Sequence, residues 1–202
     1  MRDEAGLHIR FQDFLDGNKQ EKPSSGVAIC VKNTLEEQTI PLKTDIEAVA
    51  VSVKASQCIN VCCIYTPINT LLTLTDLKTL ISQIPMPRLT VGDFNSHNPM
   101  WGSTNFNIKG RLIEDLLAEE NLNILNDGRP TRFNVHIDTT SAIDLSICDP
   151  TLSMALNWDP LPFLYGSDPY YSAISEYQPV RKWNQKNANL NKYADAIETD
   201  IE

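Results

Sequence analysis

The sequence predicts an α+β domain in which two β-layers pack against each other and helices lie on the outside. Two observations predict this fold class. Short runs rich in Val, Ile and Cys recur along the first half of the chain, and two segments with helical periodicity interrupt them. The 202 residues suit one domain with its own core, and hydrophobic residues make up 42% of them, which is ordinary for a globular protein.

Three strands are predicted before the first helix. Residues 26–32 (GVAICVK) form a short β-rich run, and residues 47–55 (EAVAVSVKA) alternate so that three valines share one face. Residues 59–67 (INVCCIYTP) are almost continuously apolar, which is typical of a strand buried on both faces. Pro67 ends this strand because it lacks the N–H that a central ladder needs.

Two amphipathic helices are predicted. The first covers residues 73–84 (TLTDLKTLISQI), with Thr75 as its expected N-cap and Pro85 beyond its end. The second covers residues 109–122 (KGRLIEDLLAEENL), where Gly110 is expected to make the start of the helix loose.

Strands are expected after each helix. Residues 88–93 (RLTVGD) form one that delivers Asp93 to its carboxyl end. Residues 131–135 (TRFNV) and 141–147 (SAIDLSI) are predicted to pair antiparallel, and residues 161–169 (LPFLYGSDP) end a further strand on a polar turn.

Composition divides the chain into three parts. Residues 1–25 are polar, contain Gly and Pro, and are expected to be poorly defined. Residues 26–176 hold the predicted domain. Residues 177–202 are polar again and are expected to form a linker, followed by a helix from about Asn189.

Charge and cysteine usage bound the class of function. The formal net charge of −9 argues against a protein that coats duplex DNA non-specifically, although a bound divalent cation would offset local carboxylates in a nuclease. Five cysteines without a CxxC pair indicate buried, reduced thiols of a nuclear or cytoplasmic protein. The sequence has neither a run of 18 apolar residues nor a signal-peptide pattern, so we expect no membrane span and no secretion.

Asp93 and Asn95 are the first candidate site residues. Residues i and i+2 of an extended chain face the same side, so a carboxylate and a carboxamide would lie together at a strand end. Their oxygens suit a hard divalent cation, or a water or phosphate beside it. An Asx turn is the alternative, and the spacing alone favours it.

Three further polar residues fall at strand ends or turns. Asp144 interrupts an apolar strand, Asp168 lies in the GSDP turn, and Tyr65 ends the apolar run INVCCIY. Each alone has an ordinary structural interpretation, such as a carboxylate held by Ser141 or a half-buried phenol. Taken together with Asp93, they are typical of a site built from separate strand ends.

The stretches GDFNSHNPMWGS, SAIDLSICDPTL and GSD occur in that order, and VRKWNQKNANLNKYADAI follows. Together they resemble the exonuclease–endonuclease–phosphatase superfamily, and within it the endonuclease domain of jockey-type non-LTR retrotransposons. The resemblance implies a four-layer α/β sandwich like that of deoxyribonuclease I. It also implies hydrolysis of duplex DNA with Mg²⁺, or Mn²⁺ as the alternative ion, and a reverse transcriptase beyond the tail. Oligomeric state stays open.

The resemblance also implies roles for the candidate residues. Asp93 would orient or activate the attacking water, Asn95 would bind the scissile phosphate, and Tyr65 would donate a hydrogen bond to it. Asp144 would hold a neighbouring group in place. Asp168 would be a metal ligand or the partner of a catalytic histidine.

Two departures from the family pattern predict weak activity or none. The family has His after the last Asp, whereas this chain has Pro169, which carries no titratable group. The family also has strands with an Asn and a metal-ligating Glu before the segment matching GVAICVK, and residues 1–25 show no equivalent of them. We therefore expect a truncated, degenerate domain that lacks its N-terminal strands.

Three functions remain open at this stage: an active endonuclease, a degenerate copy with little catalysis, and a domesticated DNA- or protein-binding module. For a binding module, five basic residues could form a local rim, or they could be scattered over the surface. They are Arg88, Lys109, Arg111, Arg129 and Arg132.

Overall fold

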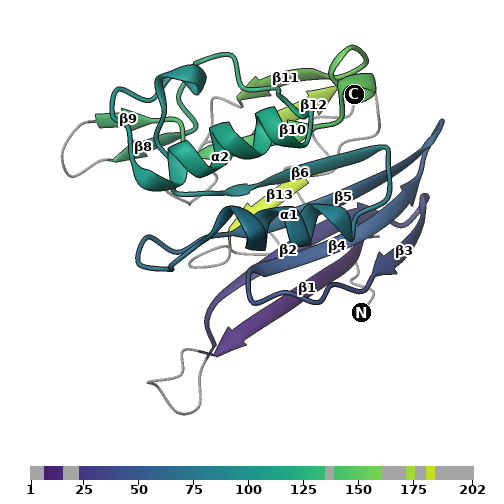
Figure 1. Cartoon of the computed structure of the whole chain (residues 1–202). Coiled ribbons are helices and arrows are strands. Elements are labelled where there is room, and N and C mark those ends of the chain that lie inside the picture. Colours follow the sequence, from purple (N-terminus) through teal and green to yellow (C-terminus); the bar gives the residue numbers. More distant parts are fainter. Residues whose placement is uncertain (1–6, 16–22, 135–138, 161–171, 176–180, 185–202) are drawn as a thin grey trace.

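A computed structural model describes residues 7–15, 23–134, 139–160, 172–175 and 181–184 (Figure 1). Its centre is a mixed sheet of six strands in the order β3-β4-β5-β6-β10-β7. The strands are β3 (Glu36–Ile40), β4 (Glu47–Lys54), β5 (Cys58–Tyr65), β6 (Arg88–Asp93), β10 (Asp144–Cys148) and β7 (Asn123–Ile124). Only β5 and β6 run parallel among these neighbours, and the remaining pairs are antiparallel.

Both faces of this sheet are buried, as the apolar run in β5 predicts. One face carries Ala50, Cys62, Ile64 and Leu145 and packs under helices. The other carries Val51, Val61, Cys63 and Val91 and packs against a second sheet. Because neighbouring side chains on a strand point to opposite faces, a continuous apolar run fills both cores at once.

Two helices cover the first face: α1 (Leu74–Ser82) and α2 (Ile108–Glu119) (Figure 1). The N-cap of α1 is Thr73, so the expectation of Thr75 is wrong. Thr73 and Asp76 form a reciprocal capping box, with the Asp76 N–H donating to Thr73 Oγ1 at 3.2 Å and the Thr73 N–H donating to Asp76 Oδ2 at 3.0 Å.

The second sheet consists of β1 (Leu7–Leu15), β2 (Pro23–Lys32) and β13 (Arg181–Asn184). Both outer strands pair antiparallel with β2, whose apolar residues pack on the large sheet. A strand, β1, thus lies within residues 1–25, the segment that was expected to be poorly defined, and it contains neither an Asn nor a Glu. Likewise, β13 is a strand within the segment expected to be a linker. Pairing both edges of β2 satisfies backbone groups that an isolated strand would leave open.

Short elements complete the described structure. They are η1 (Pro99–Trp101), β8 (Arg132–Asn134), β9 (Thr139–Ser141), α3 (Pro150–Ser153), β11 (Asn157–Pro160) and β12 (Ser172–Ser175). The predicted strand 141–147 is divided: Ser141 pairs with β8, whereas Asp144 onward pairs with β6 and β7. The helix expected from about Asn189 lies outside the described residues.

The α+β prediction is confirmed. The described residues supply three layers, which are helices, the large sheet and the second sheet. No helix in this part of the chain is long and apolar enough to cross a membrane.

Candidate active site at the end of the two-sheet sandwich

Three of the predicted site residues form one row across neighbouring strands. Tyr65 is the last residue of β5 and pairs with Asp93, the last residue of β6. Asp93 pairs in turn with Asp144, the first residue of β10. Adjacent strands lie about 4.8 Å apart, so the backbones of this polar row span about 10 Å.

The polar row lies at the end of the core between the two sheets. Tyr65 and Asp93 come two residues after Cys63 and Val91, which belong to the face that packs on the second sheet, and Asp144 lies on the same strand face as Cys148 of that core. Side chains two apart on a strand share a face. Glu47 extends the row, because it pairs with Tyr65 on the other side of β5.

Burial and the neighbouring carboxylates both raise the pKa of Tyr65 and so favour its protonated form. Burial raises the pKa of Tyr65, and the carboxylates of Asp93 and Glu47 raise it further, against an opposing effect of Arg132. A phenol that keeps its proton is a hydrogen-bond donor to an anionic oxygen.

Asn95 does not extend from Asp93 as a strand would. Its φ is 46°, in the left-handed region, so the chain turns immediately after β6. The Asn95 N–H donates to Asp93 Oδ1 at 2.9 Å, which is an Asx turn. The inference that Asp93 and Asn95 face the same side of an extended chain is therefore wrong. The buried Asn95 amide instead donates to the carbonyl of Thr66 at 3.1 Å.

Lys109 braces the same turn from α2. Its side chain is buried, and its Nζ donates to the carbonyl of Thr66 at 3.2 Å and to that of Pro67. Burial lowers the pKa of Lys109, and the nearby Asp93 carboxylate opposes that shift. The exits of β5 and β6 are thus joined through the Thr66 carbonyl, which accepts from both Asn95 and Lys109.

Asp144 is buried and held through its backbone. Thr131 Oγ1 accepts the N–H groups of Ile143 at 3.2 Å and Asp144 at 3.0 Å, and Asn126 Nδ2 donates to the Asp144 carbonyl at 2.9 Å. Between Ser141, which pairs with β8, and Asp144, which pairs with β6, the chain changes its partner strand. At this point the Thr131 hydroxyl accepts the backbone N–H groups of Ile143 and Asp144. This explains why the predicted strand 141–147 divides there.

Comparison with known proteins places the chain in a family. A family model described as endonuclease–reverse transcriptase matches residues 59–173, more than half of the chain. The chain belongs to this family. The endonuclease domain of TRAS1, a telomere-specific non-LTR retrotransposon, has a similar structure, with a TM-score of 0.65 and 21% identity. The match covers 89% of this chain and 78% of that chain. A search of curated proteins finds no match.

The family membership confirms the resemblance to retrotransposon endonucleases, and the structural match shows the deoxyribonuclease-I-like fold. Further contacts of the GDFNSHNPMWG stretch shape the chain after β6. Trp101 is fully buried and its Nε1 donates to the Ser96 carbonyl at 3.2 Å. Asn107 Oδ1 accepts the His97 N–H at 3.0 Å and the Gly110 N–H at 2.7 Å, which caps α2.

His97 lies within reach of the charge of Arg132. Burial lowers the pKa of His97, and Arg132 lowers it further. Arg132, the first residue of β8, thus lowers the pKa of both His97 and Tyr65.

Glu47 was not predicted as a site residue from the sequence. Lys109 and Arg132 were expected only as members of a basic rim. Glu47 could have been found from the hairpin turn at residues 55–57, because counting back along both strands places it opposite Tyr65.

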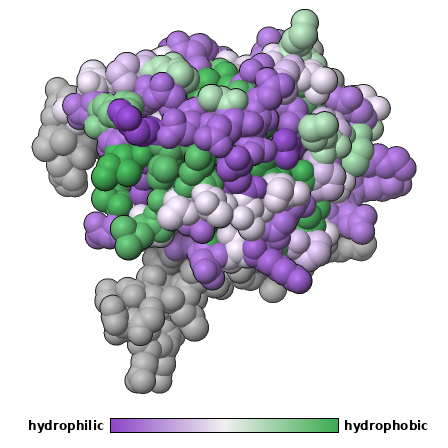
Figure 2. Space-filling model, viewed as in Figure 1, coloured by the Kyte–Doolittle hydropathy of each residue, from purple (hydrophilic) through white to green (hydrophobic). Residues whose placement is uncertain are grey.

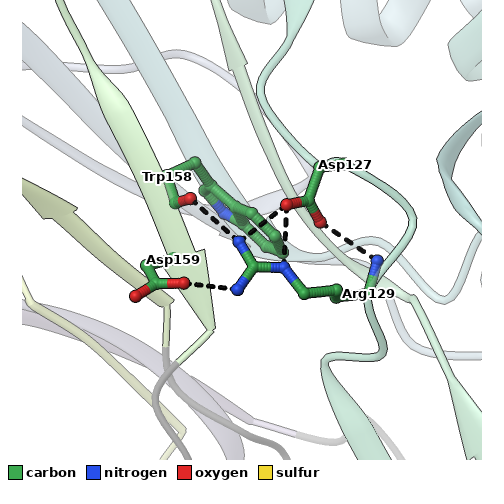
Figure 3. Close-up of polar contacts among 4 residues, drawn as sticks. All are labelled: Asp127, Arg129, Trp158 and Asp159. Atoms are coloured by element: carbon green, nitrogen blue, oxygen red, sulfur yellow. Dashed lines mark hydrogen bonds and ion pairs between the residues drawn. The ribbon is translucent and has the colours of Figure 1, made fainter.

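The five basic residues do not form a single rim. Arg88 begins β6, at the end opposite Asp93, where its Nε contacts Asp149 Oδ1 at 3.0 Å. Arg129 is held by Asp127, Asp159 and the Trp158 carbonyl, with its guanidinium 5.6 Å from the Trp158 ring centroid (Figure 3). Its Nε, Nη1 and Nη2 all donate to these partners already, so a phosphate would have to displace them.

Asp168, Pro169 and His136 lie outside the described residues. Within the described part of the chain, no group of three or more His, Cys, Asp or Glu side chains is arranged to hold a metal ion. Asp93, Asp144 and Glu47 offer oxygen donors of the kind that Mg²⁺ prefers. The described donors therefore have the right chemistry but do not complete a metal site by themselves.

Proposed function

We propose that this endonuclease domain nicks duplex DNA by metal-dependent hydrolysis of a phosphodiester at the polar row. The observation that carries the proposal is the register of Tyr65, Asp93 and Asp144 on three neighbouring strands. Groups that act on one reacting centre must lie near hydrogen-bond reach of it, and this register supports that requirement.

Each residue has a proposed task. Asp93 orients the attacking water and accepts its proton, and Tyr65 donates a hydrogen bond to a phosphate oxygen. Asn95 gives one amide hydrogen to Thr66, and the second hydrogen on the same nitrogen is our candidate donor to the phosphate. Asp144 supports Asp93 across the strand pair.

The proposed metal is Mg²⁺, with Mn²⁺ as the alternative, and Asp168 is its proposed ligand. A bound cation would stabilise the charge that develops on the phosphate oxygens. Because the described donors do not complete a site, we assign no step to the metal. Isothermal titration with Mn²⁺ tests the ligand: Asp168→Asn should weaken metal binding.

We further propose that hydrolysis is impaired. The family resemblance places His where this chain has Pro169, and proline can neither donate to the phosphate nor transfer a proton. Loss of a general acid or base typically lowers the rate by ~10²–10⁴.

Nicking of supercoiled plasmid in the presence of Mg²⁺ tests both proposals. We expect slow nicking by the natural chain, loss of nicking in Asp93→Ala, and a marked gain in Pro169→His. Asp115→Ala is the matched control, because Asp115 is an exposed carboxylate on α2. Unchanged nicking by Asp93→Ala would remove the polar row as the site. Efficient nicking by the natural chain would contradict impairment.

A binding module without catalysis is the second candidate, and the substitution of Pro169 for His is the observation that favours it. Salt-sensitive DNA affinity without nicking, even in Pro169→His, would support this alternative.

A further inference from the structure

Four large apolar side chains are exposed on two segments beside the polar row. Ile68 and Leu71, in the loop between β5 and α1, are 73% and 96% exposed. Phe106 and Ile108, at the start of α2, are 48% and 82% exposed. Figure 2 shows hydrophobic surface gathered on the left of this face, over these two segments. We call these four residues the apolar rim.

Hydrogen bonds hold the two segments of the apolar rim together and join them to the site. Lys109 Nζ, next to Ile108, donates to the carbonyls of Thr66 and Pro67, next to Ile68. Asn107 Nδ2, between Phe106 and Ile108, donates to the Asn95 carbonyl at 3.0 Å. The apolar rim therefore begins three residues after Tyr65 and is braced by the same contacts that position Asn95.

The charge around the apolar rim indicates which kind of molecule covers it. The chain contains 26 Asp and Glu residues, yet residues 66–75 and 94–108 contain none. The exposed charged residue that follows the second segment is Arg111, whereas Lys109 is buried and donates to the Thr66 and Pro67 carbonyls. Arg111 lies 5.4 Å from the centroid of the Phe106 ring, which forms a cation–π pair. Two segments that carry no carboxylate of their own, with the Arg111 guanidinium next to an exposed aromatic ring, suit a polyanion that also has apolar faces.

We infer that the apolar rim packs against DNA next to the scissile phosphate, with its side chains on deoxyribose and on the faces of unstacked bases. The inference rests on the proposed function, because it places the DNA at the polar row. Apolar side chains that contact base faces favour sequences that kink or unstack easily, such as pyrimidine–purine steps. The apolar rim would thus contribute target preference without hydrogen bonds to base edges.

Fluorescence anisotropy of two labelled duplexes tests the inference, one with a central TA step and one with a central A-tract. The natural chain should bind the TA duplex more tightly. Phe106→Ala and the double variant Leu71→Ser, Ile108→Ser should weaken binding to the TA duplex by at least ~5-fold, since stacking on an aromatic side chain contributes at least about that factor. Both should also reduce the preference between the duplexes. Met154→Ser is the matched control, because Met154 is 93% exposed beyond the opposite end of β10.

Salt dependence separates apolar contact from phosphate contact. Phe106→Ala should leave the slope of log Kd against log salt unchanged, because an apolar contact releases no counterions. Arg132→Gln should reduce the slope by about one if that guanidinium neutralises a phosphate.

The outcomes distinguish this inference from the proposed function. If the natural chain nicks DNA but the rim variants change neither affinity nor preference, the inference is overturned and the proposed function stands. If rim-dependent binding occurs and Asp93→Ala nicks as well as the natural chain, the proposed site is wrong. In that case contact between the apolar rim and DNA is supported, but its place beside the scissile phosphate is overturned together with the site. If the rim variants change only self-association in sedimentation experiments, the apolar rim is a protein interface and the inference is overturned.

Discussion

Replacing Gly110 by Ala is predicted to have two opposing effects on stability: helix propensity favours Ala, whereas tertiary packing favours Gly. Gly110 is the third residue of α2, and its N–H donates to the capping oxygen of Asn107 at 2.7 Å. A Cβ at this position would lie 2.0 Å from the backbone oxygen of His97 and 2.8 Å from the His97 carbonyl carbon. The expectation of a loose start to α2 is therefore wrong, because glycine here permits a close approach of two backbones.

The sizes of these two effects decide whether Gly110→Ala raises or lowers the free energy of unfolding. Helix propensity alone would stabilise the protein by about 1 kcal/mol. Overpacking typically costs about 1–3 kcal/mol, and a backbone carbonyl cannot move aside as a flexible side chain does. Moving His97 also strains its two hydrogen bonds with Asn107, at 3.0 and 3.1 Å, each of which contributes about 1 kcal/mol. We expect a net loss of about 2 kcal/mol.

Urea unfolding followed by circular dichroism measures this loss, and the melting temperature should fall by about 4–8 °C for a domain of this size. Asp115→Ala on the exposed side of α2 is the matched control, and it should stabilise by about 0.5 kcal/mol through propensity alone. If Gly110→Ala were as stable as the natural chain or more so, the close-approach argument would be refuted.

Two further predictions concern the surroundings of the polar row. Thr131→Val keeps the side-chain shape but leaves the N–H groups of Ile143 and Asp144 without their acceptor, so unfolding free energy should fall by roughly 2–4 kcal/mol. Thr131→Ser should lie close to the natural chain in the same urea titration, and equal stability of the two variants would contradict the argument. His97 should titrate below its ordinary pKa of about 6.5 in NMR spectra, and Arg132→Gln should raise that pKa. Because the unfolded chain then binds the proton first, stability should fall as the pH drops below about 6.5, and His97→Gln should remove part of that fall. A His97 pKa that does not respond to Arg132→Gln would contradict the assigned cause.

Local sequence patterns predicted those helices and strands in which apolar residues form a continuous run or recur at a regular spacing. The apolar run ending at Tyr65 became a strand buried on both faces, and the stripe of Ile113, Leu116 and Leu117 became the inner face of α2. The placement of Asp93 at a strand end was also correct. In each case a short stretch of chain faces one environment, so side-chain type alone reports it.

Two strands, β1 and β13, could not be predicted from local patterns in the sequence. β1 alternates Leu7, Ile9 and Phe11 with polar residues, which is a strand pattern, but the polar residues, Gly and Pro around it hide this short alternation. β13 is four residues long and pairs with β2 across more than 150 positions of sequence. Four residues carry too little periodicity to predict a strand, and the partner supplies most of the stabilising hydrogen bonds.

The sequence by itself determined the family, the α+β class and the residue types at the strand ends. Only the tertiary structure decided which of them meet. The alignment of Tyr65, Asp93 and Asp144 depends on strand register, which is fixed by pairing between distant segments. The turn at Asn95 and the burial of Lys109 against Thr66 depend on how α2 packs over the sheet. Periodicity reports the surroundings of each segment, whereas contacts between segments depend on geometry that no single stretch of sequence contains.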